Sequence, residues 1–178
     1  MSFDHALRLW IVTHRLAMLN PLLWFVSVIG RGGTVWLIIG AVLTIARRMR
    51  PIQLLQLALS ILLASTLANQ VVKPLVHRER PYVSTPQIQL LDENPNDASF
   101  PSGHASNAFA SVYALSRAVP AGRLVWWAMA LAIAYSRVYV GVHYPFDVIG
   151  GAILGLFCGM LVERTIGAII SRRTQGNP

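Results

Sequence analysis

The chain has 178 residues, of which 54% are apolar and 12% are charged, whereas a soluble domain usually carries about 25% charged residues. This composition excludes an ordinary soluble domain and indicates a chain surrounded by lipid. The formal net charge of +8 is compatible with nucleic-acid binding, but the basic residues stand singly or in short groups between apolar runs, without the basic stripe that such proteins carry. We therefore expect no nucleic-acid partner.

A membrane-spanning helix needs about 20 mainly apolar residues, so this chain can hold several spans and little else. We expect an all-α, polytopic membrane protein with a single domain over residues 1–178. The one cysteine, Cys158, lies inside an apolar run, which excludes a disulfide framework and predicts a buried side chain.

The first segment predicts a short interfacial helix over residues 3–17. Its larger apolar residues fall on one face and its charged residues on the other: Phe3, Leu7, Trp10, Ile11 and Leu16 against Asp4, Arg8 and Arg15. Because charged residues are spread through it and no small-residue cleavage site follows, we expect this segment to be retained in the mature protein. We interpret His5 and His14 as surface residues.

Two apolar runs come next, at residues 21–29 and 34–46, separated by Gly30-Arg31-Gly32-Gly33. We expect the second run to span the membrane and the first to enter it only partway. Residues 52–76 predict a further spanning helix. The polar segment 77–100, which contains three prolines and the acidic residues Asp92, Glu93 and Asp97, predicts the one sizeable loop.

Three more helices are predicted, at residues 103–117, 123–139 and 145–170. In the last of them Gly151, Gly155 and Gly159 recur at four-residue spacing, a pattern typical of close packing between membrane helices. We interpret Tyr139 and Tyr144 as aromatic residues of the membrane interface.

The distribution of arginine predicts the orientation, because loops that stay in the cytoplasm are enriched in Lys and Arg. If the four main spans alternate, one side receives Arg47, Arg48, Arg50, Arg117, Arg123, Arg164, Arg172 and Arg173. We expect that side to be cytoplasmic. The acidic loop and the candidate site residues then fall on the opposite side of the plasma membrane.

Three stretches place ionisable or polar groups at the ends of apolar helices. They contain Lys73 and Arg80; Ser102, Gly103 and His104; and Arg137, His143 and Asp147. Charged side chains in a membrane segment cost about 2.5–3.5 kcal/mol at its centre, so such residues are functional candidates. We expect all three stretches to converge on one face, where two histidines and three cations indicate an anionic partner such as phosphate.

Phosphoryl transfer needs cations around the equatorial oxygens and a positioned nucleophile. Lys73, Arg80 and Arg137 can supply the positive charge, the two arginines as bidentate forks. Ser102 and Gly103 directly precede a predicted helix, so their N–H groups and the Ser102 hydroxyl can hold an oxygen at the positive end of the helix dipole.

The two histidines suit two different tasks. Neutral His143 can act as a covalent nucleophile if a carboxylate fixes its tautomer, and Asp147 follows it by one helical turn. Asp147 would also stabilise the charged imidazolium, as in the serine-protease triad. His104 is then left to protonate the departing oxygen, a role worth about 10²–10⁴-fold in rate.

Each residue also has an ordinary structural interpretation. Lys73 could be an interfacial anchor and Arg137 a snorkelling side chain, but three spaced groups on one face favour catalysis. We interpret His77, Arg78 and Glu79 as solvated loop charges. Two histidines and one carboxylate beside several cations do not suit zinc, so we expect no metal ion and no cofactor.

The three stretches closely resemble the motifs of the type 2 phosphatidic acid phosphatase family, membrane lipid phosphatases that share their pocket with vanadium haloperoxidases. The matching segments are KPLVHRERP from Lys73 to Pro81, PSGH from Pro101 to His104, and SRVYVGVHYPFD from Ser136 to Asp147. They agree with the family in residue type, spacing and order.

The resemblance implies a metal-independent lipid phosphatase built as a bundle of about six helices, with its site near the membrane surface. It implies that His143 is the nucleophile, Asp147 its partner and His104 the general acid. The phosphate would be held by Lys73, Arg80, Ser102, Gly103 and Arg137. By analogy we favour undecaprenyl pyrophosphate as substrate; phosphatidylglycerol phosphate, phosphatidate, a lipid A phosphate, transfer to another lipid, and a carrier that binds without cleaving stay open.

Overall fold

The computed structural model describes residues 2–92 and 94–175, and all of their regular structure is helical. The predicted all-α class is therefore confirmed. The longer helices are α1 (Phe3–Thr13), α2 (Asn20–Ile29), α3 (Thr34–Ile45), α4 (Pro51–Thr66), α7 (Gly103–Ala118), α8 (Arg123–Tyr139) and α9 (Pro145–Gln175). The number of longer helices, seven, is close to the bundle of about six helices that the resemblance implied.

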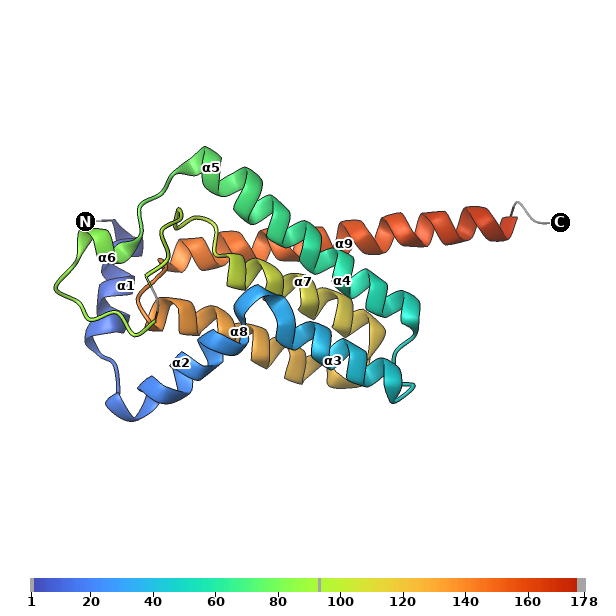
Figure 1. Ribbon diagram of the computed structural model, residues 1–178, viewed down its shortest axis with the longest axis horizontal. Coiled ribbons are helices and arrows are strands. Elements are labelled where there is room, and N and C mark those ends of the chain that lie inside the picture. Colours follow the sequence, from blue (N-terminus) through green and yellow to red (C-terminus); the bar gives the residue numbers. More distant parts are fainter. Residues whose placement is uncertain (1, 93, 176–178) are drawn as a thin grey trace.

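Helices α3, α4, α7, α8 and α9 run along the long axis of the molecule (Figure 1). Helix α1 and the loop before α7 lie at one end, which we call the loop end. The turns at residues 46–50 and 119–122 lie at the other, which we call the basic end. The C-terminal part of α9 projects beyond its neighbours there.

Helix α7 lies at the centre, in contact with α4, α8 and α9. The glycines of α9 allow its backbone to lie directly against the backbone of α7. A Cβ atom at Gly155 would lie 2.8 Å from the backbone N of Ala110 and closer still to the backbone O of Ser106, and one at Gly151 would lie 2.5 Å from the backbone O of Ser102. The predicted packing role of the glycine stripe is confirmed.

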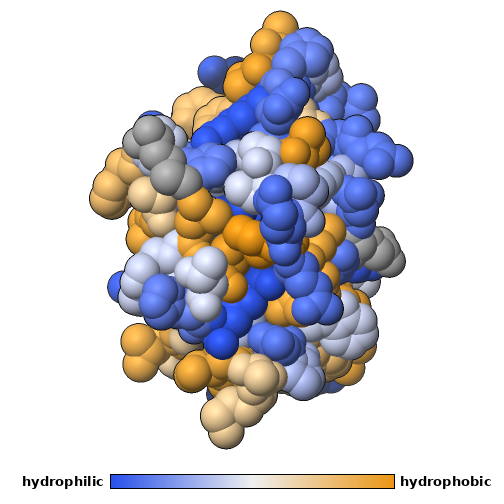
Figure 2. Space-filling model, turned by 90° about the vertical axis from the view of Figure 1, so that its left-hand side faces the viewer, coloured by the Kyte–Doolittle hydropathy of each residue, from blue (hydrophilic) through white to orange (hydrophobic). Residues whose placement is uncertain are grey.

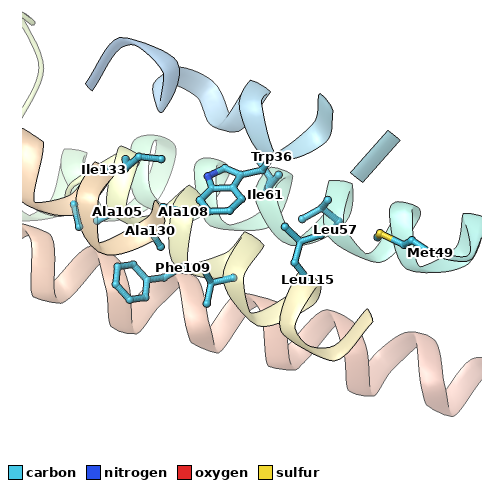
Figure 3. Close-up of a cluster of buried hydrophobic side chains, with 12 residues drawn as sticks. Trp36, Met49, Leu57, Ile61, Ala105, Ala108, Phe109, Leu115, Ala130 and Ile133 are labelled. Atoms are coloured by element: carbon cyan, nitrogen blue, oxygen red, sulfur yellow. The ribbon is translucent and has the colours of Figure 1, made fainter. Parts of the chain in front are cut away.

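The buried apolar core joins α3, α4, α7 and α8 around Trp36, Leu57 and Ile133 (Figure 3). Outside this core many large apolar side chains are exposed, among them Ile38, Leu62, Leu131 and Ile153. Such a surface would aggregate in water but is expected in lipid. Cys158 is free and buried, as predicted.

By length and composition, two helical segments of the described chain can cross a membrane, Pro51–Ser84 and Pro145–Arg172, and the bent pair Phe3–Thr13 and Ala17–Ile29 could make a third. The first segment continues from α4 through a π-helical turn, Leu67–Val72, into α5 (Lys73–Val76). Helix α3 has only 12 residues, about 18 Å at 1.5 Å per residue, which is short for the independent span that we predicted.

Helix α1 forms where predicted, but its charged face does not point into solvent. Asp4 and Arg8 are buried against the loop end, while Phe3 and Trp10 are exposed. The Asp4 carboxylate accepts a hydrogen bond from the backbone N of Phe146, 2.9 Å away, in the first turn of α9. In lipid the polar face of an amphipathic helix is the one that turns towards the protein interior.

The predicted helices at residues 103–117, 123–139 and 145–170 correspond to α7, α8 and α9, whose ends lie at or beyond the predicted limits. The loop at residues 77–100 is present and contains one short helix, α6 (Pro81–Ser84). Within it Glu93 lies outside the described residues, as does the side chain of Arg173 near the C-terminus.

Candidate active site

A cavity of about 220 Å³ lies at the loop end, between the π-helical turn, the start of α7 and the end of α8. Six of the eight predicted site residues line it: Lys73, Arg80, Gly103, His104, Arg137 and His143. Ser102 and Asp147 are fully buried behind this wall. The three motifs therefore converge, as the sequence predicted.

Figure 2 views the molecule from the loop end and shows hydrophilic residues running across a face that hydrophobic residues flank. Along the sides of the bundle many large apolar side chains are exposed, among them Ile38, Leu62 and Ile153. A lipid substrate could thus approach with its tail along the apolar sides and its charged group at the polar end.

His143 lies in the turn between α8 and α9, with a side chain that is only 2% exposed. Its Nδ1 atom is 3.5 Å from Oδ2 of Asp147, at the upper limit for a hydrogen bond, and its Nε2 atom is 3.4 Å from Nη1 of Arg80. Asp147 thus favours a proton on Nδ1, which leaves the lone pair on Nε2, the atom that faces Arg80.

The surroundings of His143 keep its imidazole neutral. Burial lowers the pKa of His143 to about 4; Asp147 opposes this shift, and the charges of Arg80 and Arg137 add to it. A neutral imidazole is the form that can attack phosphorus.

Asp147 is held by donors from three parts of the chain. Its Oδ2 accepts hydrogen bonds from Ser99 Oγ at 2.5 Å and from the backbone N of Tyr144 at 2.8 Å. Its Oδ1 accepts one from Arg78 Nη1 at 2.7 Å. With both oxygens fixed, Asp147 can hold the adjacent imidazole in one orientation.

Our interpretation of Arg78 as a solvated loop charge was wrong. Besides Asp147, Arg78 binds Asp4 through Nη2 at 2.5 Å, and its guanidinium lies 4.2 Å from the centre of the Tyr144 ring. Arg78 therefore ties α1 and the start of α9 to the carboxylate behind His143. The bare spacing of the first motif gave no signal for it, because the motif leaves this position variable.

The interpretation of the two tyrosines as interface aromatics was also wrong, since both are buried. The Tyr139 hydroxyl donates to Asn20 Oδ1 at 2.8 Å and lies 3.0 Å from the backbone O of Leu16. The Tyr144 and Ser84 hydroxyls are 3.1 Å apart. A buried hydroxyl finds such a partner because leaving it without one is costly.

Lys73 and Arg80 share a carboxylate that the sequence did not connect to them. Asp97 binds the Lys73 ammonium through one oxygen and Nη2 of Arg80, at 2.6 Å, through the other. Burial alone would raise the pKa of Asp97, but the Lys73 hydrogen bond and the Arg80 charge outweigh it and lower that pKa to about 2. Asp97 is therefore ionised at physiological pH.

Arg137 likewise meets a carboxylate from the same loop. Its Nη1 atom lies 2.5 Å from Oδ2 of Asp92 and also donates to the Ser27 hydroxyl. Both charged side chains are at most 4% exposed. An acidic loop between basic motifs was visible in the sequence, but nothing there paired particular residues.

The second motif joins the third through the backbone. The Ser102 N–H donates to the backbone O of Asp147 at 2.9 Å, and the Ser102 hydroxyl caps α7 by accepting from Ala105 N. We had expected the Ser102 N–H to hold a phosphate oxygen, but this bond to Asp147 already occupies it. The Gly103 N–H and the Ser102 hydroxyl remain the predicted contacts from this motif.

Besides His143 Nδ1, which faces Asp147 at 3.5 Å, three buried polar atoms of cavity-lining residues have no hydrogen-bond partner within the described part of the chain: His104 Nε2, Arg137 Nε and Asn107 Oδ1. Unpaired buried groups are rare because they lose their hydration without compensation. Together they indicate a polar ligand in this cavity, for which Arg137 Nε is a donor, Asn107 Oδ1 an acceptor and His104 Nε2 either one, according to its tautomer.

Sequence reasoning missed several polar residues that complete the cavity wall, namely Ser65, Asn69 and Asn107. Asn69 precedes Lys73 by one helical turn and Asn107 follows His104 by three residues, so both fall on the face of the helix that carries the motif residue. Among the described residues no group of three or more potential metal ligands is found; that the reaction needs no metal stays a prediction.

The chain belongs to the PAP2 superfamily, whose family model matches residues 53–170. This assignment covers all three motifs and makes the protein a membrane lipid phosphatase by class.

Particular relatives are similar over most of the chain. An undecaprenyl-diphosphatase of Sulfolobus acidocaldarius is 36% identical over 151 residues, which cover 83% of this chain and 71% of that protein. The crystal structure of Aquifex aeolicus LpxE superposes with a TM-score of 0.78 and 27% identity, over 92% of this chain and 96% of that one. A PAP2 type phosphatidylglycerolphosphate phosphatase of Bacillus subtilis gives a TM-score of 0.73 and 28% identity, over 93% and 85%.

Proposed function

We propose that this protein hydrolyses a prenyl diphosphate, undecaprenyl diphosphate being the favoured substrate, through a phosphohistidine on His143. The observation that carries the proposal is the His143 imidazole, which is fixed between Asp147 and Arg80 at the wall of a cavity lined by cations. An imidazole beside an anion site suits nucleophilic attack on a phosphoryl group.

In the first step the Nε2 lone pair of His143 attacks the terminal phosphorus. The N–P bond forms as the P–O bond to the prenyl phosphate breaks, and the departing oxygen takes a proton from His104. In the second step water attacks the phosphohistidine, its proton returns to His104, and phosphate leaves as the N–P bond breaks. Asp147 stabilises the imidazolium throughout.

The cations have a separate role in this scheme. Lys73, Arg80 and Arg137 would bind the non-bridging oxygens, whose charge is largest in the transition state. For this the phosphate must compete with Asp97, which holds two of them. Ser102 and Gly103 would add neutral donors at the start of α7.

The prenyl diphosphate is favoured over other phospholipids because a relative named for that activity aligns with most of this chain. Lipids with a phosphate monoester form the second candidate class. A solved structure of similar fold, named a phosphatidylglycerolphosphate phosphatase, supports it. The phosphate contacts are common to all these substrates and do not discriminate between their tails.

We place the cavity on the extracytoplasmic side of the plasma membrane. The exposed arginines Arg47, Arg48 and Arg50 lie at the opposite end, in the turn between α3 and α4, and the positive-inside rule assigns that end to the cytoplasm. Accessibility of cysteines introduced at each end to a membrane-impermeant thiol reagent would test this orientation.

The activity is tested with purified protein and a panel of undecaprenyl diphosphate, phosphatidylglycerol phosphate, phosphatidate and a lipid A phosphate, with and without a chelator. We expect release of phosphate, fastest from the diphosphate, inhibition by vanadate and no effect of the chelator. His143→Ala should lose at least about 10⁴-fold in kcat. Full activity in this variant would exclude the mechanism, and binding of phospholipid without phosphate release would identify a carrier.

A lipid-to-lipid phosphotransferase shares the phosphohistidine step and differs only in the acceptor. Product analysis with water and a lipid alcohol both present distinguishes the two. We expect inorganic phosphate as the main product, because polar side chains such as Ser65, Asn69 and Asn107 line the cavity and can bind the attacking water.

A further inference from the structure

Outside the three motifs, one more cation binds the carboxylate that holds Arg137, although it does not itself line the cavity. Arg31 lies in the turn between α2 and α3, and its Nη2 atom is 2.6 Å from Oδ1 of Asp92. The other oxygen of Asp92 is 2.5 Å from Nη1 of Arg137 and accepts a hydrogen bond from Ser27 Oγ at 2.8 Å. One carboxylate thus bridges two guanidinium groups.

This arrangement has the properties of an anion site. The Asp92 side chain is 2% exposed and that of Arg137 4%, so these two charges interact with little screening by water. The Arg31 side chain is 39% exposed, so its end of the arrangement is open to a ligand that arrives from outside. Guanidinium forks bind carboxylate and phosphate oxygens in the same geometry. The position of the Asp92 carboxylate therefore marks a place where a phosphate could be bound by Arg31 and Arg137.

A second such place lies beside it. The Asp97 carboxylate bridges Lys73 and Arg80, and both of these line the same cavity as Arg137 and His143. Two carboxylates from one loop therefore occupy two neighbouring anion positions. A lipid diphosphate has two anionic groups that could replace them, whereas a monoester has one.

The backbone that carries Arg31 is fixed on both sides. A Cβ atom at Gly30 would lie 2.7 Å from Ile133 Cγ2 and 3.3 Å from His104 Cδ2, so the turn packs directly against α8 and a site histidine. Gly33 has a φ of +75°, and a Cβ atom there would lie 2.8 Å from Ile61. Larger residues do not fit at these positions without a shift, so close packing fixes the backbone on both sides of Arg31.

We infer that Arg31 is a specificity-determining residue that, together with Arg137, binds the second phosphate of a diphosphate lipid at the position of the Asp92 carboxylate. The inference rests on the proposed function and extends it. The terminal phosphate lies at Lys73, Arg80 and His143, the phosphate attached to the tail lies at Arg31, and Arg137 binds an oxygen of each. Asp92 leaves its position when such a substrate binds.

A purely structural role for Arg31 makes a different prediction. If its ion pair with Asp92 only fixes the loop before α7, then loss of Arg31 disturbs Asp97 as well, which belongs to the same loop. Every substrate would then be affected to the same extent. A contact with the second phosphate affects only substrates that have one.

The experiment uses four substrates that combine two tails with one or two phosphates: undecaprenyl phosphate, undecaprenyl diphosphate, phosphatidate and diacylglycerol diphosphate. Arg31→Gln, Arg31→Lys and the control Arg48→Gln at the basic end are purified, and thermal stability and kcat/KM are measured for each. We expect Arg31→Gln to lower kcat/KM for both diphosphates about 10- to 100-fold and for both monophosphates less than about threefold. Arg31→Lys, which keeps the charge but not the fork, should lose less.

Equal losses on all four substrates, or no loss on any, would overturn the inference. If Arg31→Gln is too unstable to purify, the same comparison is made with Arg31→Lys. A loss of kcat/KM in Arg31→Lys that is as large for the monophosphates as for the diphosphates would also overturn the inference. Wild-type protein that cleaves only monophosphates also overturns it.

The outcome for the proposed function is separate. A wild-type protein that prefers the two glycerolipids refutes the prenyl substrate, yet the ratio between diacylglycerol diphosphate and phosphatidate still tests Arg31. Conversely, a wild-type preference for undecaprenyl diphosphate that survives in Arg31→Gln supports the proposed function and refutes the role of Arg31.

Discussion

The two ends of the bundle carry cations in opposite ways. At the loop end Lys73, Arg80 and Arg137 have side chains that are at most 9% exposed, and each is bound to a carboxylate. At the basic end Arg47, Arg48 and Arg50 are exposed, and Arg117, whose side chain is 64% exposed, pairs with Glu163 on the surface.

The difference concerns the cost of burial. An exposed arginine keeps its hydration, and a surface ion pair contributes only about 0–1 kcal/mol. A buried cation loses its hydration, and a buried ion pair often fails to recover that cost in stability. A cluster of buried cations is therefore poorly explained by stability and well explained by an anionic ligand, whose place the loop carboxylates partly take.

The largest difference between the ends should appear when one arginine is neutralised at each. Arg80→Gln removes a charge beside His143 Nε2 and Asp97, and we expect kcat/KM to fall about 10²–10³-fold, as for loss of one transition-state donor. Arg48→Gln should change kcat/KM less than about twofold. Phosphate release from the preferred lipid measures both, and a similar loss in the two variants would contradict a site confined to the loop end.

A smaller effect is expected from a substitution that weakens the hydrogen bonding of Asp147 and removes no contact to the phosphate. Arg78→Gln removes the charged hydrogen bond to Asp147 Oδ1. Such a bond is worth about 1.5–3 kcal/mol, so we expect kcat to fall about 10- to 100-fold. KM should stay within about twofold, because Lys73, Arg80 and Arg137 are unchanged.

Arg78→Lys separates orientation from charge. A lysine keeps the positive charge near Asp147 but cannot bridge Asp147 and Asp4 with a planar fork, so we expect an intermediate kcat. If KM rises while kcat is unchanged in either variant, Arg78 binds substrate and does not act through Asp147.

The burial of His143 should also appear in the pH dependence. With the pKa of His143 lowered to about 4, the imidazole stays neutral and nucleophilic above this pH and loses its lone pair as pH falls through it. We expect kcat/KM to be insensitive to His143 down to about pH 5 and to fall about tenfold between pH 4 and pH 3. An acidic limb centred near 6.5 would contradict the buried environment.

Stability of the folded state at low pH must be followed in the same experiment. The pKa of Asp97 is lowered to about 2, so its stabilising effect is present above the ordinary carboxyl pKa of about 3.9 and is lost as pH falls from there towards 2. A thermal unfolding midpoint recorded at each pH separates titration of the nucleophile from unfolding.

The sequence was sufficient for the parts of the molecule that depend on local pattern. Helices α7, α8 and α9 follow apolar runs with clear ends, and the residues of the three motifs stand at spacings that the helix geometry brings to one end. The eight predicted site residues are accordingly either in the cavity wall or directly behind it.

The ion pairs that support the site could not be predicted, because they join segments that are distant in the sequence. Arg78 and Asp147 are 69 residues apart in sequence, and Arg31 and Asp92 are 61 apart, so no periodicity links them. The charges of α1 were misleading for another reason. A polar face usually turns to water, but in a membrane protein the outside is lipid, and Asp4 and Arg8 are buried instead.

The smallest predicted effect compares two parts of α9. At Gly155 an added methyl group would meet the backbone of α7, which cannot yield as a side chain can, whereas at Gly167 it would find nothing within 4 Å. We expect Gly155→Ala to lower the free energy of unfolding by about 1–3 kcal/mol. Gly167→Ala should leave it unchanged or raise it by up to about 1 kcal/mol, because alanine favours the helix. Thermal unfolding in detergent measures both.

The same substitution links packing to the site, because Ser106 and Ala110 lie on α7, whose N-cap is Ser102 and whose first turn contains His104. Loss of activity in Gly155→Ala at temperatures where the protein is still folded would show that the close α7–α9 contact also sets the geometry of the site. Equal stability of the two variants would mean that the helices can separate enough to admit a methyl group, and that the glycine stripe is not required for their packing.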